Sequence, residues 1–259
     1  MKTALITGAS SGIGLELARL FAQNKTNVVL VARSEGKLRE LAQELNKQYG
    51  VQVRIITKDL SQYGAAQAVY DQLKTQQIAV DYLVNNAGFG DFGFFHESDW
   101  AKQEMMINLN ITALTHLTRL LVTDMVQRKS GKILNVASTA SFQPGPLMAV
   151  YYATKAYVLF FSEAIANELA DKGVTVTALC PGPTESGFQN AAAMEQSRLV
   201  KGKKLPTSAE VALYGYKAMM RGEEVAIHGL MNWLTAQSVR FTPRKMVTTL
   251  VRVLSERTH

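Results

Sequence analysis

The amino-acid sequence predicts an α/β fold: a doubly wound, mostly parallel sheet of about seven strands within a single domain, 1–259. Strand-like and helix-like segments alternate along the chain with short connections. Apolar runs such as "VVLV" are continuous, which is typical of strands buried on both faces of a parallel sheet. No linker, repeat or low-complexity tract divides the chain, so one domain is expected.

The elements follow from this alternation. Strands are expected at apolar runs such as "TALIT" and "NVVLVAR", and helices in the longer mixed segments that follow them. Strands are therefore predicted at 3–7, 27–33, 51–57, 80–88, 132–138, 174–182 and 225–229. Helices are predicted at about 13–24, 34–48, 62–76, within 98–128, and at 151–171 and 207–221. After about 183 the pattern changes to a loop-helix segment, 184–204, and a C-terminal extension, 230–259.

The composition is that of a globular protein. Hydrophobic residues make up 47% and charged residues 19% of the chain, a balance that argues against disorder. No apolar run approaches the ~18 residues of a membrane-spanning helix, and "MKTALIT" leads straight into a strand without a targeting segment. Cys180 is the single cysteine, which excludes an internal disulfide and fits a reducing compartment. We expect a cytoplasmic location.

The net charge of +7 raises the question of a nucleic-acid partner. The basic residues are mostly dispersed, and the densest runs lack the interleaved aromatic residues of a single-strand platform. Solvated basic faces are the favoured interpretation, and no nucleic-acid partner is expected.

A glycine-rich turn follows the first predicted strand. The segment "TGASSGIG" (7–14) joins that strand to a helix start, and its small residues let the backbone approach a pyrophosphate. The helix N-terminus adds free N–H groups and a positive dipole end. The segment predicts a dinucleotide site, with the candidate residues Gly8, Ser10, Ser11, Gly12, Ile13 and Gly14.

The end of the second strand distinguishes NADP from NAD. An acidic residue there would bind the ribose hydroxyls and repel a 2′-phosphate, but the sequence has Ala32 followed by Arg33 and Ser34. Arg33 offers a planar, permanently charged fork suited to a phosphate, so NADP(H) is favoured over NAD(H). Asp59 and Leu60 follow the third strand as candidate adenine contacts, although Asp59 is almost as well explained as a helix N-cap.

The segment "VYYATKA" (150–156) brings tyrosine and lysine together. Tyr151 and Lys155 are four residues apart and Tyr152 and Lys155 three apart, so either tyrosine can neighbour the lysine on a helix. A nearby ammonium favours the phenolate form of a tyrosine, and such a tyrosine can exchange a proton with a carbonyl oxygen. Ser138, after the fifth predicted strand, is a candidate to hold that oxygen. Spacing alone leaves the choice of tyrosine open.

Taken together, these motifs resemble the short-chain dehydrogenase/reductase family, short single-domain type, which has a Rossmann-like fold. The resemblance covers about the first 190 residues, and the motifs occur in the family's order. They are "TGASSGIG" at 7–14, "NNAG" at 85–88, Asn108 in "INLN", Ser138, "YYATK" at 151–155 and "PGPTES" at 181–186.

The resemblance implies roles for four catalytic residues. Family spacing places the serine thirteen residues before the tyrosine, which selects Tyr151 over Tyr152 as the general acid/base. Lys155 would bind the nicotinamide ribose and lower the pKa of the tyrosine. Ser138 would orient the carbonyl group, and Asn108 would hold a proton-relay water together with Lys155.

The resemblance also implies further cofactor contacts and no metal. The departure from the pattern is Ser11, where NADP-preferring members often have a basic residue, so Arg33 alone carries the preference for NADP. Tyr151 and Lys155 would also contact the cofactor. The other implied contacts are Asn86, Ala87, Gly88, Pro181, Gly182 and Thr184.

The substrate is expected to be lipophilic. Phenylalanines and methionines gather in "GFGDFGFF" (88–95), in "PGPLM" (144–148) and at Phe188, which suggests an apolar cleft whose pocket residues include Ser138, Met148 and Phe188. Segment 184–204 resembles the family's substrate lid. Within the family the pattern is most similar to reductases of 3-ketoacyl, hydroxysteroid and other lipophilic carbonyl compounds.

Two functions remain as hypotheses. The favoured one is NADPH-dependent reduction of a lipophilic ketone or aldehyde, with hydride transfer and Tyr151 as proton donor, in a homodimer or homotetramer. The alternative is a non-enzymatic dinucleotide-sensing or scaffold protein on the same fold. In the extension 230–259, interrupted by Pro243, packing on the domain or in a dimer is favoured over peripheral membrane contact.

Overall fold

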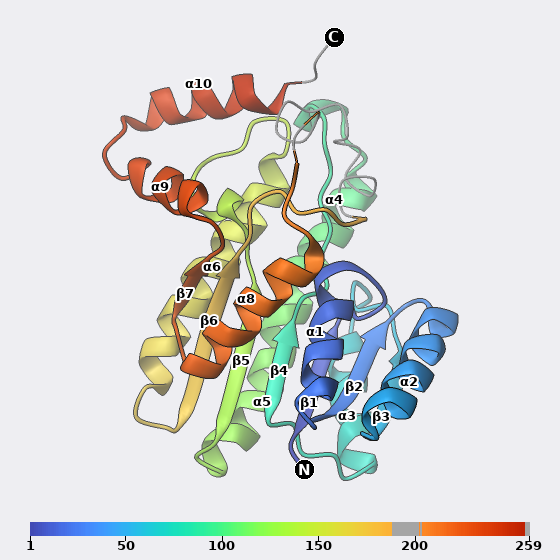
Figure 1. Cartoon of the computed structure of the whole chain (residues 1–259). Helices are drawn as coiled ribbons and strands as arrows, with labels where there is room; N and C mark the ends of the chain where they lie inside the picture. The colour runs from blue at the N-terminus through green and yellow to red at the C-terminus, as the bar shows by residue number, and fades with distance from the viewer. Residues whose placement is uncertain (188–201, 203, 257–259) are drawn as a thin grey trace.

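Seven strands form one sheet in the order β3-β2-β1-β4-β5-β6-β7, and every neighbouring pair is parallel (Figure 1). The structure is a computed structural model, and it describes residues 1–187, 202 and 204–256. It confirms the predicted fold class and sharpens "mostly parallel" to wholly parallel for the described strands. Their bounds are β1 Thr3–Thr7, β2 Asn27–Ala32, β3 Val53–Thr57, β4 Tyr82–Asn85, β5 Gly131–Val136, β6 Val174–Cys180 and β7 Val225–Ile227.

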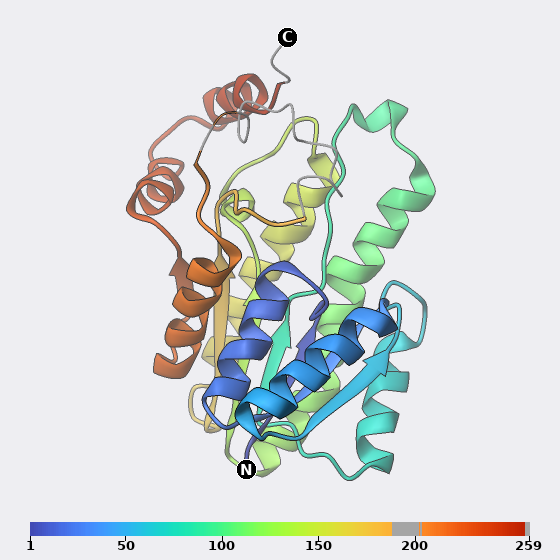
Figure 2. The same ribbon diagram turned by 45° about the vertical axis from the view of Figure 1, so that its right-hand side comes forward.

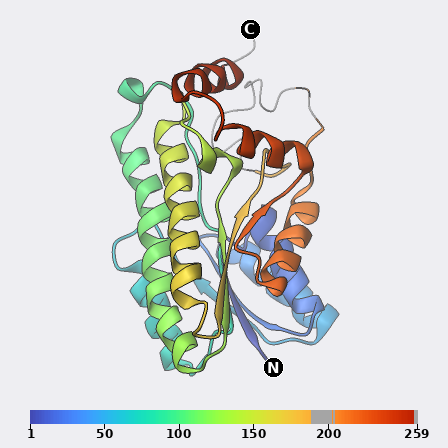
Figure 3. The ribbon, with the colours of Figure 1, turned by 90° about the vertical axis from the view of Figure 1, so that its left-hand side faces the viewer.

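Helices cover both faces of the sheet, as continuous apolar strands require (Figures 2 and 3). One core layer joins the sheet to α1 (Gly12–Gln23), α2 (Glu35–Tyr49) and α8 (Ser208–Arg221). The other joins it to α3 (Ala65–Thr75), α5 (Leu114–Gln127) and α6 (Ala149–Leu169). Phe21 and Leu117, both essentially inaccessible to solvent, belong to the two layers respectively.

The long helix predicted within 98–128 is continuous but irregular. It consists of α4 (Trp100–Ile107), a π-helical segment η2 (Asn108–Ala113) and α5. A π-turn adds a residue to the helical repeat, so it rotates the side chains that follow and is frequent at functional sites. Short 3₁₀ turns stand at Phe95–Glu97 (η1) and Thr139–Phe142 (η3).

Four polar side chains run through the core across β4 and β5. Asn85 Nδ2 donates to Thr118 Oγ1 at 2.8 Å and to Asn135 Oδ1 at 2.9 Å. Asn135 Nδ2 donates to Ser162 Oγ at 2.9 Å, and Ser162 Oγ donates to the Val158 carbonyl. All four side chains are buried, so their polar atoms satisfy one another and tie α5 to α6 through the sheet.

The chain closes with two helices beyond the carboxyl ends of the strands (Figures 1 and 3). They are α9 (Leu230–Ser238) and α10 (Arg244–Ser255), and Pro243 stands between them at the N-cap of α10. None of the helices within the described ranges has the length and apolarity to cross a bilayer.

Candidate active site

A cavity of about 1000 Å³ opens at the carboxyl ends of the strands, next to the point between β1 and β4 where the strand order reverses. Ligands of open α/β sheets bind at this position. Most residues predicted from the sequence line it. They are Gly8, Ser10, Ser11, Gly12, Ile13, Arg33, Ser34, Asp59, Leu60, Asn86, Ala87, Gly88, Ser138, Met148, Tyr151, Lys155, Pro181, Gly182 and Thr184.

The turn between β1 and α1 has the geometry of a phosphate loop. Gly8 and Gly12 adopt φ values of 66° and 57°, a region that favours glycine. Asn86 Nδ2 donates to the carbonyls of Thr7 and Gly8 at 3.0 and 3.2 Å, which fixes the loop to β4. Gly14 lies outside the cavity lining, and a Cβ there would stand 2.4 Å from the Gly8 carbonyl oxygen. Its role is close packing rather than ligand contact.

The ends of β2 and β3 form the far part of the cavity. Arg33 and Ser34 are exposed side chains on its lining. Asp59 Oδ1 accepts hydrogen bonds from the Ser61 amide at 3.0 Å and the Ser61 hydroxyl at 2.7 Å. Burial raises the pKa of Asp59, but the Ser61 hydrogen bonds and the Arg33 charge outweigh it, so the pKa is lowered and the carboxylate is charged. Asp59 caps this local turn rather than α3, whose N-cap is Gly64.

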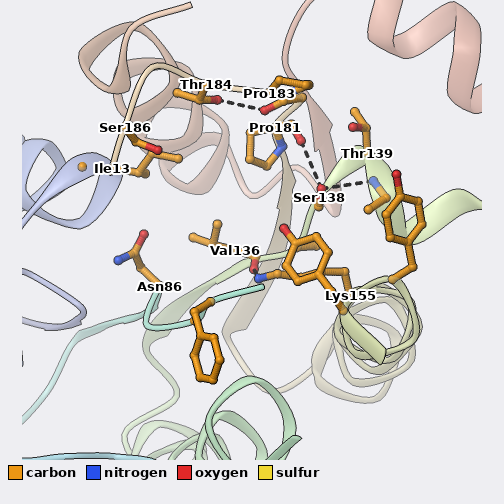
Figure 4. A pocket seen from close by; sticks show the side chains of 18 of the residues that line it. Ile13, Asn86, Val136, Ser138, Thr139, Lys155, Pro181, Pro183, Thr184 and Ser186 are labelled. Carbon is orange, nitrogen blue, oxygen red and sulfur yellow. Dashed lines mark hydrogen bonds between the residues drawn. The ribbon is translucent and has the colours of Figure 1, made fainter. Parts of the chain in front are cut away.

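Tyr151 and Ser138 meet in the cavity. Tyr151 stands near the start of α6, and its hydroxyl is hydrogen-bonded to the Ser138 side chain. Ser138 Oγ accepts from the Ala140 amide at 3.1 Å, which orients the hydroxyl at the end of β5 (Figure 4). The Tyr152 ring lies edge-on to Tyr151, against Gly145. The Tyr152 hydroxyl faces Ser255 of α10 instead of Ser138, so the structure separates the two tyrosines.

Lys155 is a buried cation one turn along α6 from Tyr151. Its ammonium donates to the Val136 carbonyl at 2.7 Å and lies 5.9 Å from the centre of the Tyr151 ring. Burial lowers the pKa of Lys155 to about 8, with a smaller opposing effect of Cys180. The lysine therefore holds its charge at neutral pH at a cost to the folded state.

The pKa of Tyr151 shifts in the direction opposite to the one that the family resemblance implied. Burial raises it, the Ser138 hydrogen bond lowers it by less, and the neighbouring Tyr152 adds to the rise. The phenol is thus protonated at neutral pH. A protonated phenol is the form that can donate a proton.

The asparagine at the site is Asn110, which corrects the sequence-based choice of Asn108. Asn110 is buried, accepts from the Phe89 amide at 3.2 Å, and donates to the Phe89 carbonyl and to Thr154 Oγ1 at 3.0 Å each. A Cβ added to Gly88 would stand 3.0 Å from Asn110 Oδ1 and 3.6 Å from Lys155 Nζ. Neither asparagine is on the cavity lining itself, but Asn110 lies directly behind Gly88, which lines it, whereas Asn108 is partly exposed. The π-turn that begins at Asn108 could not be anticipated from "INLN".

The segment after β6 forms another wall. Thr184 Oγ1 donates to the Gly182 carbonyl at 2.9 Å, and Pro181 accepts from the Thr139 amide (Figure 4). A Cβ on Gly182 would stand 2.6 Å from Asn232 Nδ2 of α9, so glycine permits this close approach.

The apolar part of the lining differs from the prediction. Met148 and Phe89 line the cavity, whereas Phe94 and Phe95 are exposed elsewhere, and Phe188 lies outside the described residues, as does most of 184–204. Sequence reasoning missed the contribution of the C-terminal extension. Its lining residues include Met231, Ala236, Val239, Val247, Leu250, Val251 and Leu254. A mixed basic and apolar segment gave no signal of which residues would face inward.

We expect Lys155→Met to stabilise the cofactor-free protein. Below about pH 8 Lys155 is charged in both the folded and the unfolded protein, so the folded state bears the full free-energy cost of the buried charge. Between about pH 8 and 10.5 Lys155 loses its proton in the folded protein but keeps it in the unfolded protein, so this cost decreases with rising pH. The variant should gain about 1–3 kcal/mol in unfolding free energy at pH 7, shrinking as the pH rises past 8. Chemical denaturation across pH measures this. Lys217→Met, at an exposed site, is the control. If the difference in unfolding free energy between Lys155→Met and wild type stayed the same from pH 7 to 10, the prediction would be contradicted.

The residues present fit a dinucleotide. The cavity volume lies at the top of the usual range of roughly 300–1,000 Å³ for small-molecule sites. Glycine at position 8 lets the loop pack closely on Asn86 and Ala87, because a Cβ there would stand within 3 Å of both, and the loop lines the cavity in this position. Arg33 and Ser34 suit a 2′-phosphate. No group of three or more metal-ligating side chains occurs among the described residues.

Comparison of the chain with known proteins identifies its family. Residues 2–197 match the family model described as short chain dehydrogenase, and the chain belongs to that family. The chain is 35% identical over 185 residues to the very-long-chain 3-oxoacyl-CoA reductase of Anas platyrhynchos, covering 69% of this chain and 58% of that protein. It thus spans less than two thirds of the length of this curated relative.

Solved structures match over most of the chain. The short-chain dehydrogenase from Sphingobium yanoikuyae in complex with NADPH is 33% identical, with a TM-score of 0.82 over 93% of this chain and 94% of that one. The bulky-bulky ketone specific alcohol dehydrogenase from Comamonas testosteroni is 32% identical, with a TM-score of 0.80 over 93% and 92%.

Proposed function

We propose that the protein is an NADPH-dependent reductase of a ketone or aldehyde group in a lipophilic substrate. The observation that carries this is the meeting of a protonated Tyr151, its partner Ser138 and the buried cation Lys155 on one cavity. The relatives support it: one is named for 3-oxoacyl-CoA, one is specific for bulky ketones, and one was solved with NADPH.

In this proposal NADPH, when bound, supplies the hydride for the carbonyl carbon. Ser138 donates a hydrogen bond to the carbonyl oxygen, and the Tyr151 phenol gives that oxygen a proton, so that C=O becomes CH–OH. Lys155 binds the ribose hydroxyls and stabilises the tyrosinate that remains. Asn110 is a positioning residue, because it holds the backbone at Phe89 against Thr154.

The substrate part of the cavity favours an apolar chain or ring system. Met148 is buried on one side, and Val247, Val251 and Leu254 of α10 stand on the cavity lining. Burying apolar surface contributes about 25 cal/mol per Å², so each added methylene of a bound chain gains about 0.8 kcal/mol. Longer acyl substrates should therefore be preferred until the cavity is filled.

A panel of carbonyl compounds with NADPH consumption as the readout tests the proposal. It contains a chain-length series of 3-oxoacyl thioesters, a bulky diaryl ketone, a steroid ketone and dihydroxyacetone as the polar control. We expect kcat/KM to rise about tenfold per added methylene pair until the cavity is filled, and to be lowest for dihydroxyacetone. NADPH binding without turnover of any of these compounds would contradict the proposal and favour the dinucleotide-sensing alternative.

A further inference from the structure

The helix α10 forms a wall of the cavity and lies next to α6, the helix that carries Tyr151 and Lys155. Val247 is buried and lines the cavity together with Val251. At the far end of α10, Ser255 is buried and its side chain faces Tyr152 of α6. The Arg252 guanidinium lies 4.8 Å from the centre of the Phe94 ring. These contacts place one face of α10 toward the cavity.

Other apolar side chains of α9 and α10 point away from the cavity. Leu230, Trp233 and Leu234 repeat at helical spacing on α9, and Met246 and Val253 stand on α10. These five, together with Phe241 in the connecting turn, are 45% to 87% exposed and do not line the cavity. We call these six residues the apolar patch. Single exposed apolar residues are ordinary, but such a concentration on two consecutive helices marks an interaction surface.

The charges beside the apolar patch identify its partner. Segment 230–256 contains four basic residues and one acidic residue, Glu256, which is paired with Arg252. Arg240 is exposed and its charge acts on Glu163 of α6, whereas Arg244 and Lys245 are exposed and have no acidic neighbour in this segment. A second copy of the chain on the same patch would bring these like charges together. An anionic surface with an apolar interior complements both the charges and the patch.

We propose that α9 and α10 dock the protein on the surface of a bilayer that contains anionic lipids. The apolar patch enters the boundary between headgroups and acyl chains, where tryptophan is favoured, and Arg244 and Lys245 contact the headgroups. The wall of the cavity then belongs to the same helix that touches the lipid. Under the proposed function, a lipophilic substrate would reach Tyr151 along α10; the docking itself does not depend on that function.

Sedimentation of the protein with vesicles tests the docking. The vesicles are phosphatidylcholine alone or phosphatidylcholine with phosphatidylglycerol. We expect about tenfold or stronger binding to the mixed vesicles, weakening with salt. The triple variant Phe241→Ser, Met246→Ser, Val253→Ser should lose about 100-fold or more in binding, and Arg244→Glu with Lys245→Glu should remove the preference for phosphatidylglycerol. Tyr63→Ser, at a fully exposed aromatic residue outside the patch, should bind like wild type.

Two controls make the test decisive. Circular dichroism and thermal melting should be unchanged in the triple variant, because its three positions are exposed. Light scattering reports self-association through the same patch. Absence of binding to the mixed vesicles, equal binding by the triple variant, or a dimer that the triple variant converts to a monomer without vesicle binding would each overturn the proposal. None of these readouts uses carbonyl reduction, so failure of the docking and failure of the proposed function are distinguishable.

Discussion

Replacing Tyr151 with phenylalanine is expected to lower kcat for carbonyl reduction by about 10²–10⁴-fold. The change removes one oxygen, the group that is hydrogen-bonded to Ser138 and stays protonated because burial raises its pKa. The ring remains, so the cavity keeps its shape. NADPH affinity should change by less than about threefold, since most of the predicted cofactor contacts lie elsewhere. Steady-state kinetics and fluorescence titration of NADPH measure the two effects.

Tyr152→Phe is the matched control for this experiment. It removes the same atom from the adjacent residue of the same helix, but that hydroxyl faces Ser255 on α10. We expect a variant with kcat within about threefold of wild type and an unfolding free energy within about 1 kcal/mol of it, because the ring that packs against Gly145 remains. If Tyr152→Phe were the inactive variant and Tyr151→Phe the active one, the assignment of the proton donor would be wrong.

Replacing Arg33 with alanine is expected to remove the preference for NADPH. Hydrogen bonds to a charged group contribute about 1.5–3 kcal/mol, so NADPH should bind about 10- to 100-fold more weakly, while NADH binding stays nearly constant. Arg33 is exposed at the cavity, so the substitution should leave the unfolding free energy within about 0.5 kcal/mol of wild type.

Arg39→Ala provides the control for the loss of one positive charge. Arg39 stands on α2, where it is exposed and paired with Glu35, and it is not part of the cavity lining. Its removal should leave the ratio of NADPH to NADH affinity unchanged. An Arg33→Ala variant that keeps the wild-type ratio would show that the preference arises elsewhere in the cavity.

The fold and the cofactor part of the site were predictable because their signals are local. Buried parallel strands need continuous apolar runs, and a loop that approaches a phosphate needs glycine at positions such as Gly8 and Gly12. The choice of Tyr151 over Tyr152 came from the family resemblance, because the family's spacing of serine and tyrosine matches Ser138 and Tyr151. The apolar runs and the glycine-rich loop are each contained in a short stretch of residues, and the structure shows the strands and the loop at those positions.

The remaining parts depend on interactions between distant segments. The choice between Asn108 and Asn110 depends on a π-turn that no residue pattern announces. The pKa of Tyr151 depends on burial by the whole fold rather than on the lysine one turn away. The inward face of α10 became evident only once Ser255 was placed against Tyr152. Tertiary packing decides all three.

The line of buried polar side chains through Asn85 and Asn135 constrains how this sequence can evolve. Each polar atom in it is satisfied by the next, from Thr118 to Ser162. One apolar substitution would leave a buried partner without its hydrogen bond, at a cost of about 1–3 kcal/mol, although replacing a bonded pair by apolar groups of the same shape can be nearly neutral. A single substitution, which must come before the replacement of a bonded pair, is therefore expected to be selected against. Lineages that descend from this protein should keep the line whole even where their substrates diverge.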